Sequence, residues 1–195
     1  MKKIFISLML VAAFSVTNAQ TKSTNSASVS WIKSTTVLTY KVVANGSQYD
    51  YVVDSLTLGN SIAFRWKMGA PKNMKGKVRM SQQALDTASA MNNYFRNNEF
   101  LDLKDKTSVW MGRKIRKAIA ENKPITVDPQ NTREVLTPKG EKSYTFTING
   151  TSTTIKVLYA ETASGKKFWF LNDAVNPLIL KMDLGWTIEL ISVTK

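Results

Sequence analysis

The chain has 195 residues, 43% of them hydrophobic, with a formal net charge of +13 and neither Cys nor His. Because His and Cys are the commonest metal ligands, ordinary zinc, copper and haem sites are excluded, and so are Ser-His-Asp and Cys-His catalysis. The sequence contains neither GxGxxG nor GxxxxGK[ST], so no motif supports a nucleotide phosphate site. We therefore expect no cofactor and no metal.

The first 19 residues have the parts of a secretory signal peptide. Lys2 and Lys3 precede an apolar run over residues 4–16, and small residues lead up to a cleavage point after Ala19. No later apolar stretch approaches the roughly 18 residues of a membrane span. We predict a signal peptide over 1–19 and an exported protein, periplasmic or secreted, with no transmembrane segment in its mature chain. Loss of Lys2 and Lys3 leaves a charge of +11.

The rest of the chain is long enough for one domain, and without Cys it must rely on its apolar core. A polar, Ser- and Thr-rich stretch predicts a flexible leader over 20–34. We assign 35–195 to a single β-rich domain.

The first part of that domain has the pattern of a β-meander. We predict strands over 37–44, 49–58 and 61–68, with a bulge near Asp54-Ser55. Asn45-Gly46 is a strong tight-turn pair because both residues tolerate a positive φ.

Helical spacing follows. Ser81 can cap a helix over 82 to about 96, after a short strand at 77–80. A short strand over 107–110 leads to a second helix over 111–121.

The last third is β again, with Asn149-Gly150 and Ser164-Gly165 as turns. From Leu178 to Leu190 every second residue is apolar, and Gly185 allows either one long curved strand or two. The other predicted strands are 125–128, 144–148, 153–160 and 168–171.

This order of elements predicts an α+β fold. We expect a mainly antiparallel, strongly curved sheet, a half-barrel, with one or two helices packed on its concave face.

Several fragments have the residue types of catalytic motifs. Residues 86–89, Asp-Thr-Ala-Ser, resemble the aspartic-protease loop, but the helical pattern runs through them and places Asp86 in the first turn of a helix. The Ser-x-x-Lys fragments at 30–33 and 164–167 lie in the leader and in a turn, where nothing would lower a Lys pKa. The acidic cluster Glu99, Asp102 and Asp105 lacks the spacing of a calcium loop. No catalytic residue is assigned.

Two sets of side chains are candidates for binding. Apolar strand residues would line a ligand cavity if the half-barrel is hollow, and would be core if it is filled; they are Phe64, Trp66, Met68, Trp110, Trp169, Met182 and Trp186. The basic residues of the second predicted helix would contact an anionic surface, or would simply be solvated; they are Arg113, Lys114, Arg116 and Lys117.

A resemblance adds to these observations. Five stretches resemble uncharacterised exported β-rich proteins of Gram-negative bacteria: residues 18–20, 38–42, 62–68, 107–111 and 176–180. The layout is similar to the lipoprotein-carrier half-barrels, and that likeness implies lipid binding without assigning any catalytic residue.

The leading hypothesis is an exported, non-enzymatic protein that binds an apolar or amphiphilic ligand or a cell-envelope partner, and we expect no nucleic acid as partner. One alternative is a carboxylate-dependent hydrolase of envelope polymers, with two acidic side chains about 5–10 Å apart; its candidate pool is Asp54, Asp128, Asp173, Asp183 and Glu189. The other alternative is an adhesive or scaffold module for anionic polymers, which the +11 charge favours.

Overall fold

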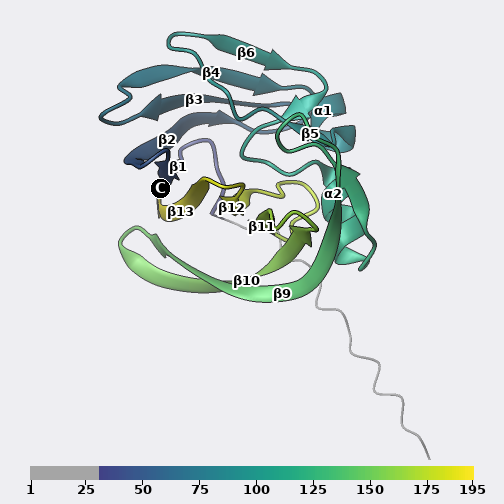
Figure 1. The fold of residues 1–195 in the computed structure, drawn as a ribbon. Helices are drawn as coiled ribbons and strands as arrows, with labels where there is room; N and C mark the ends of the chain where they lie inside the picture. The colour runs from purple at the N-terminus through teal and green to yellow at the C-terminus, as the bar shows by residue number, and fades with distance from the viewer. Residues whose placement is uncertain (1–30) are drawn as a thin grey trace, which may run out of the picture.

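The computed structural model describes residues 31–195, so the predicted signal peptide and most of the predicted leader lie outside the described residues. One large, mostly antiparallel sheet of eleven strands dominates this part of the chain, in the order β6-β4-β3-β2-β1-β13-β12-β11-β10-β9-β8 (Figure 1). Its strands are β1 (Val37–Ala44), β2 (Ser47–Thr57), β3 (Ile62–Met68), β4 (Met74–Met80), β6 (Phe100–Leu103), β8 (Ile125–Val127), β9 (Glu134–Ile148), β10 (Thr151–Thr162), β11 (Lys167–Phe170), β12 (Ile179–Asp183) and β13 (Thr187–Thr194).

The first meander, β1 to β4, confirms the predicted strands and turns. Asn45 and Gly46 both have a positive φ, of 50° and 73°, which suits the tight turn between β1 and β2. The register of β2 against β3 shifts between Asp54 and Thr57, and Ser55 has a φ of 54°. The predicted bulge is therefore present, and β4 begins at Met74, earlier than predicted.

The second meander contains β9 to β13. Asn149 and Gly150 turn the chain between β9 and β10, and both have a positive φ. The alternating run from Leu178 to Leu190 is two strands, β12 and β13, because Gly185, with a φ of 88°, lies in the turn that reverses the chain between them. Most of β9 was missed, since its first ten residues include Pro138 and Gly140, which are disfavoured in strands.

The last strand in chain order joins the two meanders. β13 lies between β1 and β12 and pairs antiparallel with both. The end of β9 also pairs with it, in parallel, at Thr147 and Ile148. The sheet curves between these contacts, with β3, β4 and β6 at the top of Figure 1 and β9 and β10 at the bottom.

Helix α1 (Gln82–Thr87) is much shorter than predicted, so the predicted helix over 82 to about 96 is wrong beyond Thr87. Ser81 does cap it, accepting a hydrogen bond from the backbone N–H of Ala84 at 3.1 Å. After Ala88 the backbone becomes extended, and the N–H of Met91 donates to the carbonyl of Asp128. Backbone bonds to distant strands thus replace helical bonds, and β5 (Ala90–Met91) pairs with β7 (Lys106–Thr107).

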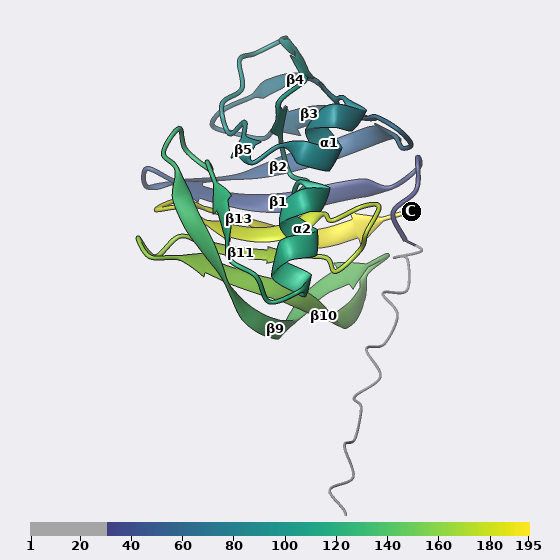
Figure 2. The ribbon, with the colours of Figure 1, turned by 90° about the vertical axis from the view of Figure 1, so that its right-hand side faces the viewer.

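Helix α2 (Arg113–Ala120) confirms the second predicted helix, with slightly shorter ends. Ile115 and Ile119 are buried, as its apolar side requires. Figure 2 shows α1 and α2 next to each other on the same side of the sheet.

One hydrophobic core connects both meanders. Buried tyrosines tie the strands together: the Tyr40 hydroxyl donates to the carbonyl of Ile179 at 3.0 Å, and the Tyr144 hydroxyl lies 3.0 Å from the carbonyl of Leu180 and 2.9 Å from that of Leu190. The last residues of the predicted leader also pack here, because Trp31 is buried against Phe146, with ring centroids 5.3 Å apart. Within residues 31–195, none of the helices has the length and apolar character needed to cross a membrane.

Candidate functional site

The outward face of β3 and β4 carries cations in directly opposite positions. Arg65 on β3 lies opposite Lys77 on β4, and Lys67 lies opposite Lys75. All four residues are exposed. Like charges directly opposite one another on neighbouring strands repel and destabilise the pairing, so this hairpin carries a charge arrangement that its own folding does not favour.

The carboxylates around these pairs are fewer than the cations. Asp54 on β2 pairs with Arg65, with the Oδ1–Nε distance at 2.9 Å, and Asp102 on β6 lies beside Arg79 on β4. Lys67, Lys75 and Lys77 have no ion pair among residues 31–195. The face is therefore cationic overall and suits an anionic partner.

A groove of about 570 Å³ runs over this face and includes both like-charged pairs. We call it the β3–β4 groove; Asp54, Arg65, Trp66, Lys67, Lys75, Gly76, Lys77, Asn98, Glu99 and Phe100 line it. Phe100 adds an apolar surface to this groove, because its side chain is 60% exposed and lies beside Lys77 in the sheet.

Gly76 fixes the shape of the groove floor. A Cβ at this position would lie 2.6 Å from the indole of Trp66 and 2.6 Å from the carbonyl oxygen of Glu99. The absent side chain thus allows Trp66 to pack beneath β4 while the chain leading into β6 approaches from the edge. That carbonyl accepts the N–H of Lys77 at 2.9 Å.

The groove does not have the carboxylate spacing of a glycosidase. In the described part of the chain, Asp54 and Glu99 are its only acidic lining residues. Asp54, Arg65, Lys77 and Phe100 lie in one row across four strands, so the outer two are about 14 Å apart at roughly 4.8 Å per strand. Glu99 adjoins Phe100. The hydrolase alternative gains no support here.

The seven predicted ligand-binding residues do not form one site. Phe64 and Trp110 stack on each other in the core, with ring centroids 5.6 Å apart and both nearly inaccessible. Trp66 is also buried, stacked on Tyr51. Trp169 lies against Tyr159, with Lys142 and Lys181 nearby.

Only Met68, Met182 and Trp186 come together, at a small cavity of about 50 Å³ on the inner face of the sheet. We call it the inner cavity. The remaining predicted ligand residues pack against other side chains, and Trp66 also lines the β3–β4 groove.

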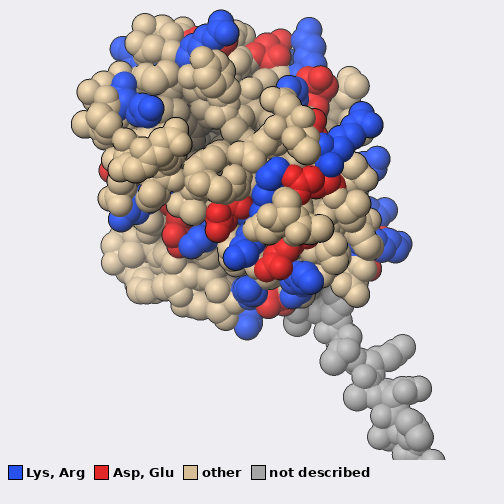
Figure 3. Space-filling view, in the orientation of Figure 1, with Lys and Arg blue, Asp and Glu red and all other residues tan. Residues whose placement is uncertain are grey.

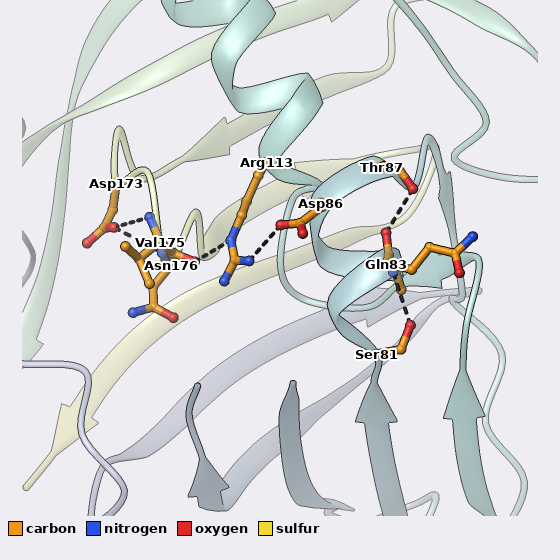
Figure 4. Close-up of polar contacts among 9 residues, drawn as sticks. Ser81, Gln83, Asp86, Thr87, Arg113, Asp173, Val175 and Asn176 are labelled. Carbon is orange, nitrogen blue, oxygen red and sulfur yellow. Dashed lines mark hydrogen bonds and ion pairs between the residues drawn. The ribbon is translucent and has the colours of Figure 1, made fainter. Parts of the chain in front are cut away.

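Half of the predicted basic surface of α2 is engaged within the protein. Arg113 donates to Asp86 at 2.7 Å and to the carbonyl of Val175 at 3.1 Å, so it joins α2 to α1 and to the loop at 173–176 (Figure 4). Arg116 donates to Asn172. Lys114 and Lys117 are exposed. Of the four predicted basic residues, these two are available to contact an anionic surface or water.

The residues singled out for catalysis have structural partners. Asp86 belongs to the last turn of α1, which corrects its predicted place in the first turn. Oδ1 of Asp173 accepts the backbone N–H groups of Val175 and Asn176, at 2.8 and 2.9 Å. Ser164 donates to Glu134 in the turn before β11.

Other carboxylates have cationic partners. Glu134 pairs with Lys166, and hydrogen bonds from Lys166, Ser164 and Thr162 lower the pKa of Glu134 to about 2. Glu189 pairs with Lys181 at 3.0 Å. Asp128 differs from these, because one of its carboxylate oxygens is buried and has no hydrogen-bond partner within residues 31–195. Within 31–195 no group of three acidic side chains is arranged to hold a metal ion.

Sequence reasoning missed most of the β3–β4 groove. The signal was present, since Lys75, Lys77 and Arg79 alternate and so share one face of a strand. It was lost because the strand predicted here covered only residues 77–80, which leaves Lys75 outside it. Phe100 was missed because β6 is short and pairs in parallel with β4, which local pattern does not reveal.

Charge is distributed differently elsewhere on the surface. In the view of Figure 3, Lys and Arg lie beside Asp and Glu across the middle and right of the molecule.

Comparison of the chain with known protein families, curated proteins and solved structures finds no match.

Proposed function

We propose that this is an exported, non-enzymatic binding protein whose β3–β4 groove binds an anionic polysaccharide of the cell envelope. The observation that carries the proposal is the presence of two pairs of like-charged residues in opposite positions on β3 and β4: Arg65 opposite Lys77 and Lys67 opposite Lys75. Repulsion between directly opposite cations costs stability in the free protein. An anionic polymer in the groove removes that cost, so binding and the relief of repulsion act in the same direction.

The spacing of the cations supports a repeating anionic ligand. Neighbouring strands lie about 4.8 Å apart, and residues i and i+2 on one strand about 6.8 Å apart. Arg65, Lys67, Lys75 and Lys77 thus form a two-by-two grid on this scale. A polymer with a charge on successive sugar units meets several of these cations at once.

Phe100 favours a sugar polymer over other polyanions. Its ring is 60% exposed beside Lys77 at the rim of the groove. Pyranose rings have an apolar C–H face, which can cover an aromatic ring while the charged substituents reach the cations.

The interior of the sheet has no space for a long acyl chain, so a lipid-carrier function is less well supported than binding in the groove. Phe64, Trp66 and Trp110 fill the interior that such a chain would need, and the inner cavity is only about 50 Å³.

We further propose that the curved sheet is a half-barrel with α1 and α2 on its concave side. The contact of β9 with β13 and the burial of Ile115 and Ile119 support this arrangement.

Binding of dextran sulfate by the chain 20–195, with neutral dextran as the reference ligand, tests the proposal. The variant Lys67→Gln/Lys75→Gln removes two groove cations and should weaken binding about tenfold or more. Lys114→Gln/Lys117→Gln removes two exposed cations from α2 and serves as the charge-matched control. It should bind as the unmodified chain does.

Salt and the aromatic ring give further readouts. Affinity should fall as salt rises, because exposed charges are screened beyond about 10 Å at 0.1 M. Phe100→Ala should weaken binding without changing the salt dependence. Equal losses in both double variants would mean that net charge alone attracts the polymer and would refute a groove-specific function.

A further inference from the structure

The inner cavity lies on the opposite face of the sheet from the β3–β4 groove. Residues of β1, β2, β3, β12 and β13 contribute to it, and Phe95 and Val109 contribute from the connecting segments. Its walls include Tyr51, Met68, Met182 and Trp186. Sequence reasoning placed three of these four in a ligand site, but it did not single out Tyr51.

Tyr51 has a buried hydroxyl without a hydrogen-bond partner in the described residues. The residue is 2% exposed. The neighbouring tyrosines differ, since the Tyr40 hydroxyl bonds a backbone carbonyl of β12 and that of Tyr144 bonds carbonyls of β12 and β13. A buried polar group left without a partner costs free energy, so the Tyr51 hydroxyl needs a partner that residues 31–195 do not supply.

Burial keeps this hydroxyl protonated. Desolvation raises the pKa of Tyr51 far above its ordinary value, so the group keeps its proton and can donate it. A suitable partner is therefore an acceptor oxygen or nitrogen.

The cavity limits the size and charge of that partner. A volume of about 50 Å³ accommodates about three to five non-hydrogen atoms, at roughly 10–15 Å³ for each water-sized group. Among residues 31–195, no Lys, Arg, Asp or Glu lines the cavity, so a charged group would be buried without a counter-ion from this part of the chain. Met68 and Met182 add flexible, polarisable walls that adapt to small apolar shapes.

We propose that the inner cavity binds the end of a small neutral molecule, mainly apolar, that carries one acceptor, and that the Tyr51 hydroxyl donates to this acceptor. This inference does not depend on polysaccharide binding, because groove and cavity are lined by different residues. Either can fail while the other stands.

A matched pair of probes tests the proposal. Butan-2-one and 2-methylbut-1-ene have the same five-atom skeleton, and a CH₂ group in the second replaces the carbonyl oxygen of the first. Titrations followed by the NMR signals of the Met68 and Met182 methyl groups report occupancy of the cavity. In the chain 20–195 both probes should shift these signals.

Tyr51→Phe removes only the hydroxyl. The affinity of the ketone relative to that of the alkene should then fall about three- to tenfold, as for the loss of one hydrogen bond. Tyr94→Phe removes the same atom from an exposed tyrosine outside the cavity and should leave the ratio unchanged.

Two results would overturn the proposal. Methyl signals of Met68 and Met182 that do not respond to either probe would mean that the cavity holds only water. An unchanged ketone-to-alkene ratio in Tyr51→Phe would mean that the hydroxyl does not contact the ligand.

Discussion

The outward faces of the two meanders differ in how their cations are paired. On the second meander Lys181 lies between Trp169 and Glu189 in the sheet, and it forms an ion pair with Glu189 at 3.0 Å. Lys142 lies 3.5 Å from the ring centroid of Tyr159. On the first meander, Lys67 lies between Val52 and Lys75 in the sheet, and neither lysine forms an ion pair within residues 31–195. Cations that are paired within the fold stabilise it, whereas the opposed cations are the basis of the proposed binding role.

The greatest loss of stability should follow a substitution in the groove floor. Gly76→Ala places a Cβ 2.6 Å from Trp66 and from a backbone carbonyl, so we expect a loss of about 1–3 kcal/mol in the free energy of unfolding. Gly69→Ala is the control, because its nearest contact would be an ordinary 3.8 Å. Urea denaturation of both variants measures the difference. Equal stabilities would mean that Gly76 does not fix the groove floor.

A pH-dependent effect should appear on the second meander. Because the pKa of Glu134 is lowered to about 2 in the folded state, its contribution is fully present above the ordinary pKa of about 4.3 and is lost as the pH falls through about 2. Stability should therefore decrease between about pH 5 and pH 2, and less steeply in Glu134→Gln. Thermal unfolding across this range measures both slopes. Parallel curves would contradict the assignment.

The sharpest form of the comparison uses one substitution on each face. Lys181→Gln removes a favourable ion pair and should lower the free energy of unfolding by about 0.2–1 kcal/mol. Lys75→Gln removes a repulsion and should raise the free energy of unfolding by a similar amount. At about 2–4 °C per kcal/mol, the melting temperature should shift by up to a few degrees, in opposite directions. Shifts of the same sign would show that the two faces do not differ as described.

The smallest expected effect concerns the inner cavity. Tyr51→Phe removes a hydroxyl that has no hydrogen-bond partner among residues 31–195, so the ligand-free chain should unfold at nearly the same denaturant concentration as the unmodified chain, or slightly higher. Tyr144→Phe should be less stable, because that hydroxyl lies within hydrogen-bonding distance of two carbonyls. Chemical denaturation distinguishes the two. A loss in Tyr51→Phe as large as in Tyr144→Phe would place an unseen partner at Tyr51.

Local chemistry predicted the parts of the fold that local chemistry determines. Asn45-Gly46 and Asn149-Gly150 turn the chain as their tolerance of a positive φ requires, and the helix over 113–120 follows from its apolar spacing. The segment after Thr87 was mispredicted because its backbone bonds Asp128 and Thr107, which are far away in sequence. Such bonds leave no trace in a helical pattern.

The candidate site was less predictable for a related reason. Phe168, Trp169 and Phe170 are all aromatic, so alternation could not show that Phe168 and Phe170 are buried while Trp169 is only partly so. The cationic face depends on the register between β3 and β4, which places Lys67 opposite Lys75. Composition gave the excess of positive charge, but only the pairing of strands shows where it is concentrated.

The position of β13 has a consequence for how the molecule forms. This strand is the last in chain order, yet it lies in the middle of the sheet between β1 and β12. Until it docks, β1 has an open edge and the early and late hairpins share no backbone bond in the large sheet. Long-range closure of this kind slows folding, and without β13 both β1 and β12 would have an exposed edge that favours aggregation.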